Sequence, residues 1–386
     1  MNRTKLSKHK KVEYIELVYD LIFVYLIRRC DEIMVLEKSG FFSAENFEVY
    51  LFSILVILQI WAFSTLYINR YGKNGFAEYI FLFLNMYLLC FLAVDTRRDW
   101  VTTYVPYQIA WGLIIVNLAV QYFRQLRRRD TGIREQHFLM RRFCIFCIQA
   151  AAVFLCIPLF LTVHRSFVWA ALAIGYLGPL FTRQLDREAP VNMDHLSERV
   201  MLFVVLSFGE TLISVTEYFS GEITPALIYF SACIFLIVAG MLISYGFIYT
   251  KLLDKRRVGV GTLFMFLHVF VVVAINNVTV GLEFMREEES NNSMMLLFLV
   301  TSFLLYYTSL LVVAHRAGRY YLPAVKTWIP FLIISAAFAA AMFCFTDSPA
   351  INAGISVIYP FAMLIAIRVR RADEKKEHPD LPEEAL

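Results

Sequence analysis

The sequence predicts an all-α, polytopic transmembrane helical bundle. Of its 386 residues, 59% are hydrophobic and only 18% are charged, whereas soluble globular domains carry roughly 45–50% apolar and roughly 25% charged residues. The apolar residues form blocks of about 20, the number of helical residues that crosses a hydrocarbon core of about 30 Å. Since lipid offers the backbone no hydrogen-bond partners and no alternating barrel pattern is present, each block should be an α-helix.

About twelve such spans can be placed along the chain. The first contains charged residues, and the sixth is interrupted by Gly175, Gly178 and Pro179, so ten or eleven spans remain open alternatives. In chain order the expected spans are 13–34, 47–68, 76–95, 101–123, 143–163, 166–181, 197–216, 224–250, 261–284, 293–315, 327–345 and 350–369.

The basic residues between these spans predict the orientation of the chain. Lysine and arginine are retained in short cytoplasmic loops. With twelve spans and a cytoplasmic N-terminus, 29 of the 36 basic residues fall on the cytoplasmic side, and the seven outside are Arg28, Arg29, Lys38, Arg97, Arg98, Arg165 and Arg286. We therefore expect both termini in the cytoplasm.

This orientation can be tested by labelling from outside the cell. An engineered thiol near Ser290, in an expected outer loop, should react with an impermeant maleimide, because that loop faces the medium. A thiol near Arg128, in an expected inner loop, should react only after permeabilisation. Labelling of both positions in intact cells would contradict the predicted topology.

We expect a single transmembrane domain over residues 1–371, followed by a polar cytoplasmic tail at 372–386. Two parallel six-helix halves, 1–190 and 191–371, are conceivable, because the seventh span begins much as the first does. Chance similarity between two amphiphilic helices explains the match equally well.

The segment 124–142 carries seven arginines between apolar residues. It could lie as an amphipathic helix on the anionic inner leaflet, with Arg127, Arg128 and Arg129 near lipid headgroups. Nucleic-acid binding is the other interpretation of such a cluster, and membrane proximity explains it more simply. We therefore expect membrane lipids, and no nucleic acid, as partners.

The first expected helix carries acidic residues on one face. Glu13, Glu16, Asp20 and Asp31 fall together at 100° per residue. An acid within a span costs about 2.5–3.5 kcal/mol on insertion scales, so this face should point into the bundle. It is either an ion or proton site open to the cytoplasm or a structural ion pair with a base such as Arg199 or Arg28.

The seventh expected helix carries a second polar group. His195, Arg199 and Glu210 share one face, while Glu198 points about 120° away from Glu210. Glu210 should lie near the bilayer midplane, after a glycine, Gly209, that would let another helix approach closely. It is the strongest single candidate for a proton relay or substrate site, and a buried structural carboxyl is the alternative. We predict that the Glu16–Asp20 face packs toward Arg199.

Two secondary polar candidates, Asn276 and Asn277, lie on the ninth span and could line a cavity. An ordinary interhelical hydrogen bond is the simpler explanation. Cys144 and Cys147 form one C-x-x-C pair without the second pair of a zinc site, so neither a metal nor a cofactor is expected.

Two stretches resemble a known family. EYIELVYDLIFVYLI is similar to the first-helix motif of the bacterial low temperature requirement A (LtrA) family, and HLSERVMLFVVLSFGETLISV to its second signature. Arg28 and Arg29 depart from the small and polar residues usual there. The resemblance implies a multi-pass protein of the bacterial cytoplasmic membrane, without a mechanism. The matching motif residues are Glu16, Asp20, Phe23, His195, Glu198, Arg199, Gly209 and Glu210.

Three functions fit these features. An ion- or proton-coupled secondary transporter or permease of unknown substrate is favoured by the many spans and the intramembrane acids. A non-catalytic sensor or scaffold, and a membrane-embedded enzyme using His195, Glu198 and Glu210 as acid and base, are the alternatives. A cavity open to one side and lined by Asp20 and Glu210 would favour transport, whereas a dry ion-paired core would favour a scaffold.

Overall fold

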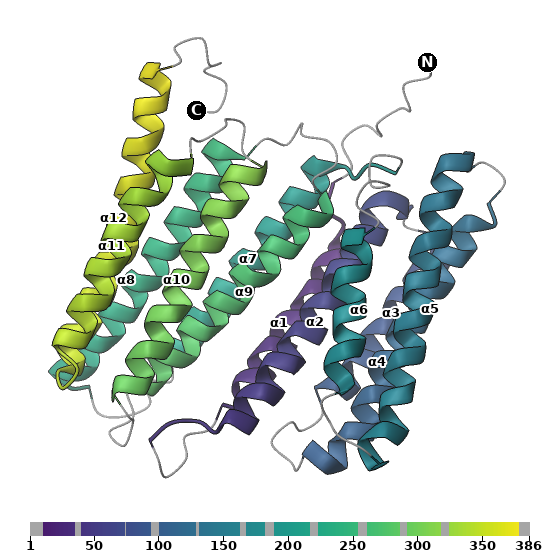
Figure 1. Cartoon of the computed structure of the whole chain (residues 1–386), viewed down its shortest axis with the longest axis horizontal. Coiled ribbons are helices and arrows are strands. Elements are labelled where there is room, and N and C mark those ends of the chain that lie inside the picture. Colours follow the sequence, from purple (N-terminus) through teal and green to yellow (C-terminus); the bar gives the residue numbers. More distant parts are fainter. Residues whose placement is uncertain are drawn as a thin grey trace. The chain divides into compact units, whose positions relative to one another are not determined.

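The computed structural model describes residues 11–34, 40–73, 75–93, 100–128, 131–162, 167–181, 189–216, 223–253, 261–285, 292–317 and 324–377. These residues form twelve α-helices (Figure 1). In chain order they are α1 Tyr14–Asp31, α2 Ala44–Tyr71, α3 Phe76–Leu92, α4 Trp100–Leu126, α5 Ile133–Thr162, α6 Phe167–Phe181, α7 Met193–Thr216, α8 Pro225–Phe247, α9 Gly261–Phe284, α10 Asn292–Ala317, α11 Ala324–Cys344 and α12 Pro349–Glu377.

Each expected span overlaps one of these helices, and the all-α membrane architecture is confirmed. Seven helices of the described chain are long and apolar enough to cross a membrane, as judged by length and composition: α2, α4, α5, α8 with its π-helical end Ile248–Leu252, α9, α10 and α12. Helices α3, α6 and the Trp328–Cys344 part of α11 are apolar but shorter. The total of twelve spans and the cytoplasmic termini stay predictions.

Local signals in the sequence explain where several helices begin. The Ser43 side chain caps α2 by accepting a 3.1 Å hydrogen bond from the Asn46 amide. Thr224 caps α8 in the same way through the Leu227 amide at 3.2 Å, and Pro225 takes the first helical position. Both patterns satisfy amides that a helix N-terminus leaves without a backbone partner.

The fold divides into two compact units. Unit 1 comprises 1–35, 43–203 and 255–269, and unit 2 comprises 36–42, 204–254 and 270–386, so the division falls within α7 and α9. In unit 1, α2 contacts α1, α4 and α6, while α5 lies along both α4 and α6. Most of α2 is buried by these neighbours. The expected single domain, and its possible division after residue 190, stay predictions.

In unit 2, α12 packs against α8 and α11. Gly240 of α8 allows this, because a Cβ at that position would lie 2.7 Å from Pro360 Cβ of α12. Buried tyrosines join helices by hydrogen bonds. The Tyr306 hydroxyl of α10 donates to the Met241 carbonyl of α8 at 2.9 Å, and Tyr359 of α12 and Ser335 of α11 share a hydrogen bond of 2.9 Å.

The sixth span differs from its expectation. Helix α6 runs without a break from Phe167 to Phe181, so Gly175 and Gly178 do not interrupt it. A Cβ at Gly178 would lie 2.8 Å from Ile145 Cγ2 of α5. These glycines serve close helix packing instead.

The arginine-rich segment also differs. It is not one helix, because α4 ends at Leu126 and α5 begins at Ile133. Arg142 is only 2% exposed, and its guanidinium lies 5.2 Å from the centre of the Phe138 ring. Arg129 lies outside the described residues, and lipid contact by Arg127 and Arg128 stays a prediction.

Candidate functional site

The core of unit 1 contains a buried ion pair between α1 and α7. Arg199 donates two hydrogen bonds to Asp20, from Nε to Oδ2 at 3.2 Å and from Nη2 to Oδ1 at 2.8 Å. Both side chains are 0% exposed. Such a bidentate pair fixes the geometry of both groups. The predicted approach of Arg199 to the acidic face of the first helix is confirmed.

Asp20 has a further partner on α2. The Trp61 indole donates a hydrogen bond of 2.9 Å from Nε1 to Asp20 Oδ1. The Trp61 ring in turn stacks on Phe203 of α7, with centroids 4.0 Å apart. Three donated hydrogen bonds and an aromatic cover hold Asp20 in a fixed, dry position, as expected of a structural carboxylate.

Glu16, which lies one helical turn before Asp20 on α1, also pairs with Arg199. Arg199 Nη1 donates to Glu16 Oε2 at 3.0 Å, and His195 Nε2 lies 3.4 Å from the same oxygen. Glu16 is 1% exposed. Two carboxyl groups therefore face one guanidinium. With both acids ionised and the histidine neutral, the cluster carries an excess negative charge, which is costly in a buried site.

Asn69, near the end of α2, contacts the Nδ1 atom of His195, on the opposite side of the ring from Glu16. Asn69 Nδ2 lies 3.0 Å from His195 Nδ1 and donates to the Asn192 carbonyl at 2.9 Å. Asn69 Oδ1 accepts from the Asn192 amide at 2.8 Å. The start of α7 is thus fastened to α2. Asn69 and Trp61 were not predicted as site residues, because neither belongs to a recognisable polar motif on the strongly apolar helix α2.

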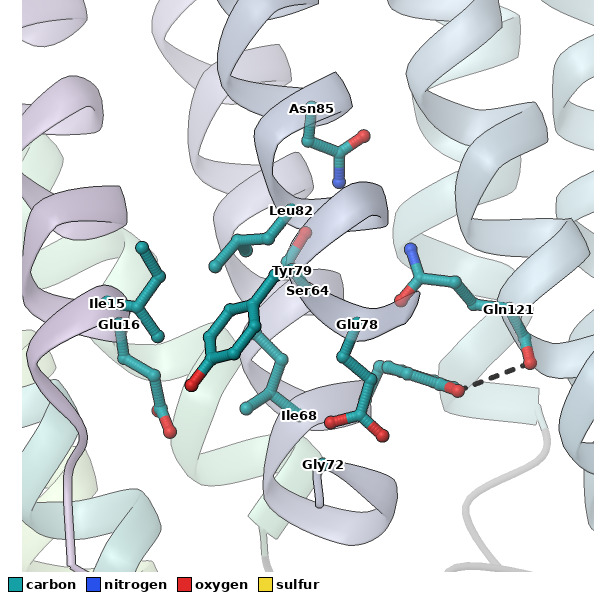
Figure 2. Close-up of a pocket in the computed structure, with 11 residues that line it drawn as sticks. Ile15, Glu16, Ser64, Ile68, Gly72, Glu78, Tyr79, Leu82, Asn85 and Gln121 are labelled. Carbon is teal, nitrogen blue, oxygen red and sulfur yellow. Dashed lines mark hydrogen bonds between the residues drawn. The ribbon is translucent and has the colours of Figure 1, made fainter. Parts of the chain in front are cut away.

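A cavity adjoins the cluster in unit 1. Figure 2 shows Glu16 of α1 together with Glu78 and Tyr79 of α3 on its walls. About 30 Å³ of it is open to the centres of water-sized molecules, enough for a few waters, since one needs roughly 10–15 Å³ by this measure. The lining residues are Ile15, Glu16, Ser64, Tyr67, Ile68, Gly72, Glu78, Tyr79, Leu82, Asn85 and Gln121.

A chain of hydrogen bonds leads from this cavity into the protein. Ser64 Oγ lies 3.0 Å from the Tyr19 hydroxyl, to which Asn85 Nδ2 also donates at 3.4 Å. Asn117 Nδ2 donates to Asn85 Oδ1 at 2.6 Å, which fixes the orientation of the Asn85 amide. The cavity wall therefore joins a polar network that includes the residue before Asp20.

Other predicted site residues lie elsewhere. Glu198 is exposed, and Glu210 is half-buried in unit 2. The cavity is lined by Glu16, and neither Asp20 nor Glu210 is among its lining residues, so this cavity is not the one that would have favoured transport. The expectation for Gly209 is also wrong, since within the described chain no neighbouring atom lies within 4 Å of where its Cβ would stand.

The secondary candidates lie on α9 in unit 2. Asn276 and Asn277 are both buried. Nearby, α7 and α9 are joined by a hydrogen bond of 2.8 Å between the hydroxyls of Thr211 and Thr279. A pathway role for these asparagines stays a prediction.

One known protein family matches most of the chain. The family model described as bacterial low temperature requirement A protein (LtrA) matches residues 11–364. The chain belongs to the LtrA family. It is accordingly a multi-pass bacterial membrane protein, and no curated protein or solved structure matches it.

In this LtrA protein, residues from the two motifs meet in one place. Glu16 and Asp20 come from the first motif, and His195 and Arg199 from the second. Two further acids of the second motif lie elsewhere, since Glu198 is exposed and Glu210 belongs to unit 2. Among the described residues, no group of three or more histidine, cysteine or acidic side chains is arranged to hold a metal ion.

Proposed function

We propose that this LtrA protein is an ion-coupled secondary transporter in which Glu16 takes up and releases a proton. The observation that carries the proposal is the position of Glu16. Its carboxylate belongs to the buried Arg199 cluster and also lines the water-sized cavity. Acids buried in membrane domains are costly and commonly mark ion or proton pathways.

The two carboxylates of the cluster have different surroundings, which supports different roles. Asp20 receives two hydrogen bonds from Arg199 and one from Trp61. Glu16 receives one hydrogen bond from Arg199 and lies at the cavity. One proton on Glu16 would cancel the excess negative charge of the cluster. Glu16 is therefore the exchangeable acid, and Asp20 the fixed one.

The cavity lies where protons from the cytoplasm could enter. Its walls come from the start of α1, the end of α2, the start of α3 and the end of α4. The topology predicted from the basic residues places all four of these ends on the cytoplasmic side. The space suits water or a small ion, so the transported solute must bind elsewhere or in another conformation.

A structural scaffold is the second candidate, and the Asp20–Arg199–Trp61 group favours it. These side chains form the dry, paired core expected of a protein whose polar groups only hold helices together. The two candidates differ in the role of Glu16. In a scaffold, a side chain of the same shape could replace Glu16. In a proton-coupled transporter, Glu16 must be able to gain and lose a proton.

Charge movement in proteoliposomes tests the proposal. A step from neutral to mildly acidic buffer on a solid-supported membrane should produce a transient inward current in the wild type, because protons enter the cluster. Glu16→Gln should abolish most of that current, while the exposed Glu198→Gln should retain it. Equal currents from wild type and Glu16→Gln, or none from either, would contradict the proton role.

The transport step needs its own measurement. Vesicles containing the protein should accumulate or expel at least one solute from a bacterial metabolite extract when a pH gradient is imposed. Mass spectrometry of vesicle contents, with empty vesicles and Glu16→Gln as controls, identifies that solute. If no solute responds to the gradient in wild-type vesicles, the scaffold is the better explanation.

A further inference from the structure

The hydrogen bonds of Asn69 determine which way its amide group points. The backbone N–H of Asn192 can only donate, so the Asn69 atom 2.8 Å from it must be the oxygen. The backbone carbonyl of Asn192 can only accept, so the atom 2.9 Å from it must be the nitrogen. The orientation that is usually ambiguous for asparagine is therefore fixed twice by backbone groups.

This orientation determines the protonation state of His195. The Asn69 nitrogen that donates to Asn192 also lies 3.0 Å from His195 Nδ1. Because an amide NH₂ can only donate, Nδ1 must accept and carries no proton. A neutral imidazole then bears its hydrogen on Nε2, the atom 3.4 Å from Glu16 Oε2. At this distance Nε2 lies close to the carboxylate but makes no aligned hydrogen bond with it.

We infer that Asn69 is a positioning residue that holds His195 as the neutral Nε2–H tautomer and so keeps the exchangeable proton of the cluster on Glu16. Protonating Nδ1 would set an N–H against the Asn69 NH₂ and lose that hydrogen bond. His195 is 0% exposed, so water cannot replace the lost bond. A neutral His195 cannot cancel the excess negative charge, which leaves Glu16 to do so.

Other charged groups lie around this histidine and must be considered together. Arg199 is a buried cation beside His195, and Glu16 and Asp20 are the acids that pair with it. Arg70, next to Asn69, is directed to the Ala189 carbonyl at 2.9 Å. The charged residues nearest to His195 along these three helices are Glu16 and Asp20 of α1, Arg70 of α2, and Asp194, Glu198 and Arg199 of α7. Asp194 and Glu198 are exposed, whereas Arg199 is buried.

Nitrogen NMR of the histidine ring tests the inference directly. The protein has seven histidines, so the His195 signals in ¹⁵N-histidine-labelled protein in lipid nanodiscs can be identified by their loss in His195→Gln. The wild type should show an unprotonated Nδ1 and a protonated Nε2. A protonated Nδ1 in the wild type would overturn the inference without any variant.

Two substitutions at Asn69 should change the ring in different ways. Asn69→Asp places an acceptor opposite Nδ1, so His195 should become doubly protonated. Asn69→Leu offers neither donor nor acceptor, so the single tautomer should be lost. Asn192 Oδ1 accepts a hydrogen bond of 3.3 Å from the His195 amide. The matched control Asn192→Ser keeps a side-chain oxygen there and the backbone groups that hold Asn69, and should leave the tautomer unchanged. A role of Asn69 in folding alone would lower yield without these ring changes, and an unchanged Nδ1 in Asn69→Asp would contradict the inference.

The inference rests on the proposed function only where it treats the proton on Glu16 as the coupling proton. The NMR measurement needs no transport. If the expected tautomer is found and Glu16→Gln still carries the full current, the tautomer assignment stands and the proton role of Glu16 fails. If the current depends on Glu16 but His195 carries a proton on Nδ1, the proton role of Glu16 stands and the tautomer assignment fails.

Discussion

Replacing Arg199 with glutamine should sharply lower the yield of folded protein, because it leaves Glu16 and Asp20 buried without their shared cation. Removing one member of a buried ion pair costs about 3–5 kcal/mol. Arg199 is 0% exposed and donates three hydrogen bonds to the two acids. We expect a much smaller monodisperse peak in detergent chromatography and a lower apparent melting temperature.

The carboxylates should respond unequally, which is a sharper test than the loss itself. Asp20→Asn weakens three hydrogen bonds, including the one from Trp61, and should destabilise the protein. Glu16→Gln removes the excess negative charge and should cost little or even raise stability. A Glu16→Gln variant as unstable as Asp20→Asn would contradict the charge balance on which the proposed function depends.

Double variants separate pairing from general damage. Asp20→Asn combined with Arg199→Gln should cost less than the two single effects together, because Asp20 is then no longer a buried charge without its cation, and only Glu16 loses its partner. The matched control Arg127→Gln changes an exposed arginine and should shift stability by no more than about 0.5 kcal/mol. Additive losses in the double variant would show that the pair is not coupled.

The sequence was sufficient to predict the helices and the principal pairing, for reasons that particular residues illustrate. Apolar runs of spanning length leave few alternatives to helices in lipid. Glu16 and Asp20 lie on one face, and burying them is costly, so a cation had to be near. Arg199 was the base at matching depth on another helix that was expected to begin in the cytoplasm.

The same reasoning failed for residues whose role depends on which other helix lies beside them. Helical periodicity places Glu210 and Gly209 around their own helix but does not say which helix they face, and Gly209 has no close neighbour within the described chain. Asn69 could have been suspected, since the end of α2 and the start of α7 are expected at the same membrane depth. Its amide orientation, and the cavity beside Glu16, depend on three-dimensional contacts that no sequence pattern encodes.

The second large effect is expected at Gly175 of α6. A Cβ there would lie 2.4 Å from Gln149 Nε2 and 2.5 Å from Gln59 Nε2. Both glutamines are 0% exposed, Gln149 Nε2 donates to Gln59 Oε1 at 2.5 Å, and Gln59 Nε2 donates to the Leu172 carbonyl at 3.0 Å. These side chains cannot move without breaking buried hydrogen bonds. Gly175 therefore lets α6 approach the polar contact between α2 and α5.

Gly175→Ala should accordingly destabilise the protein by about 2–3 kcal/mol, through overpacking and the loss of a buried hydrogen bond. In an open helix position the same change is favourable by up to about 1 kcal/mol.

Gly209→Ala is the matched control, since no neighbouring atom of the described chain lies within 4 Å of its Cβ position, and it should be neutral or stabilising. Combining Gly175→Ala with Gln149→Ser should cost less than the sum of the two, because the shorter side chain vacates the space that the new methyl group needs. Apparent melting temperatures in one detergent would decide this, and equal values for Gly175→Ala and Gly209→Ala would show that α6 is not packed as closely as the structure has it.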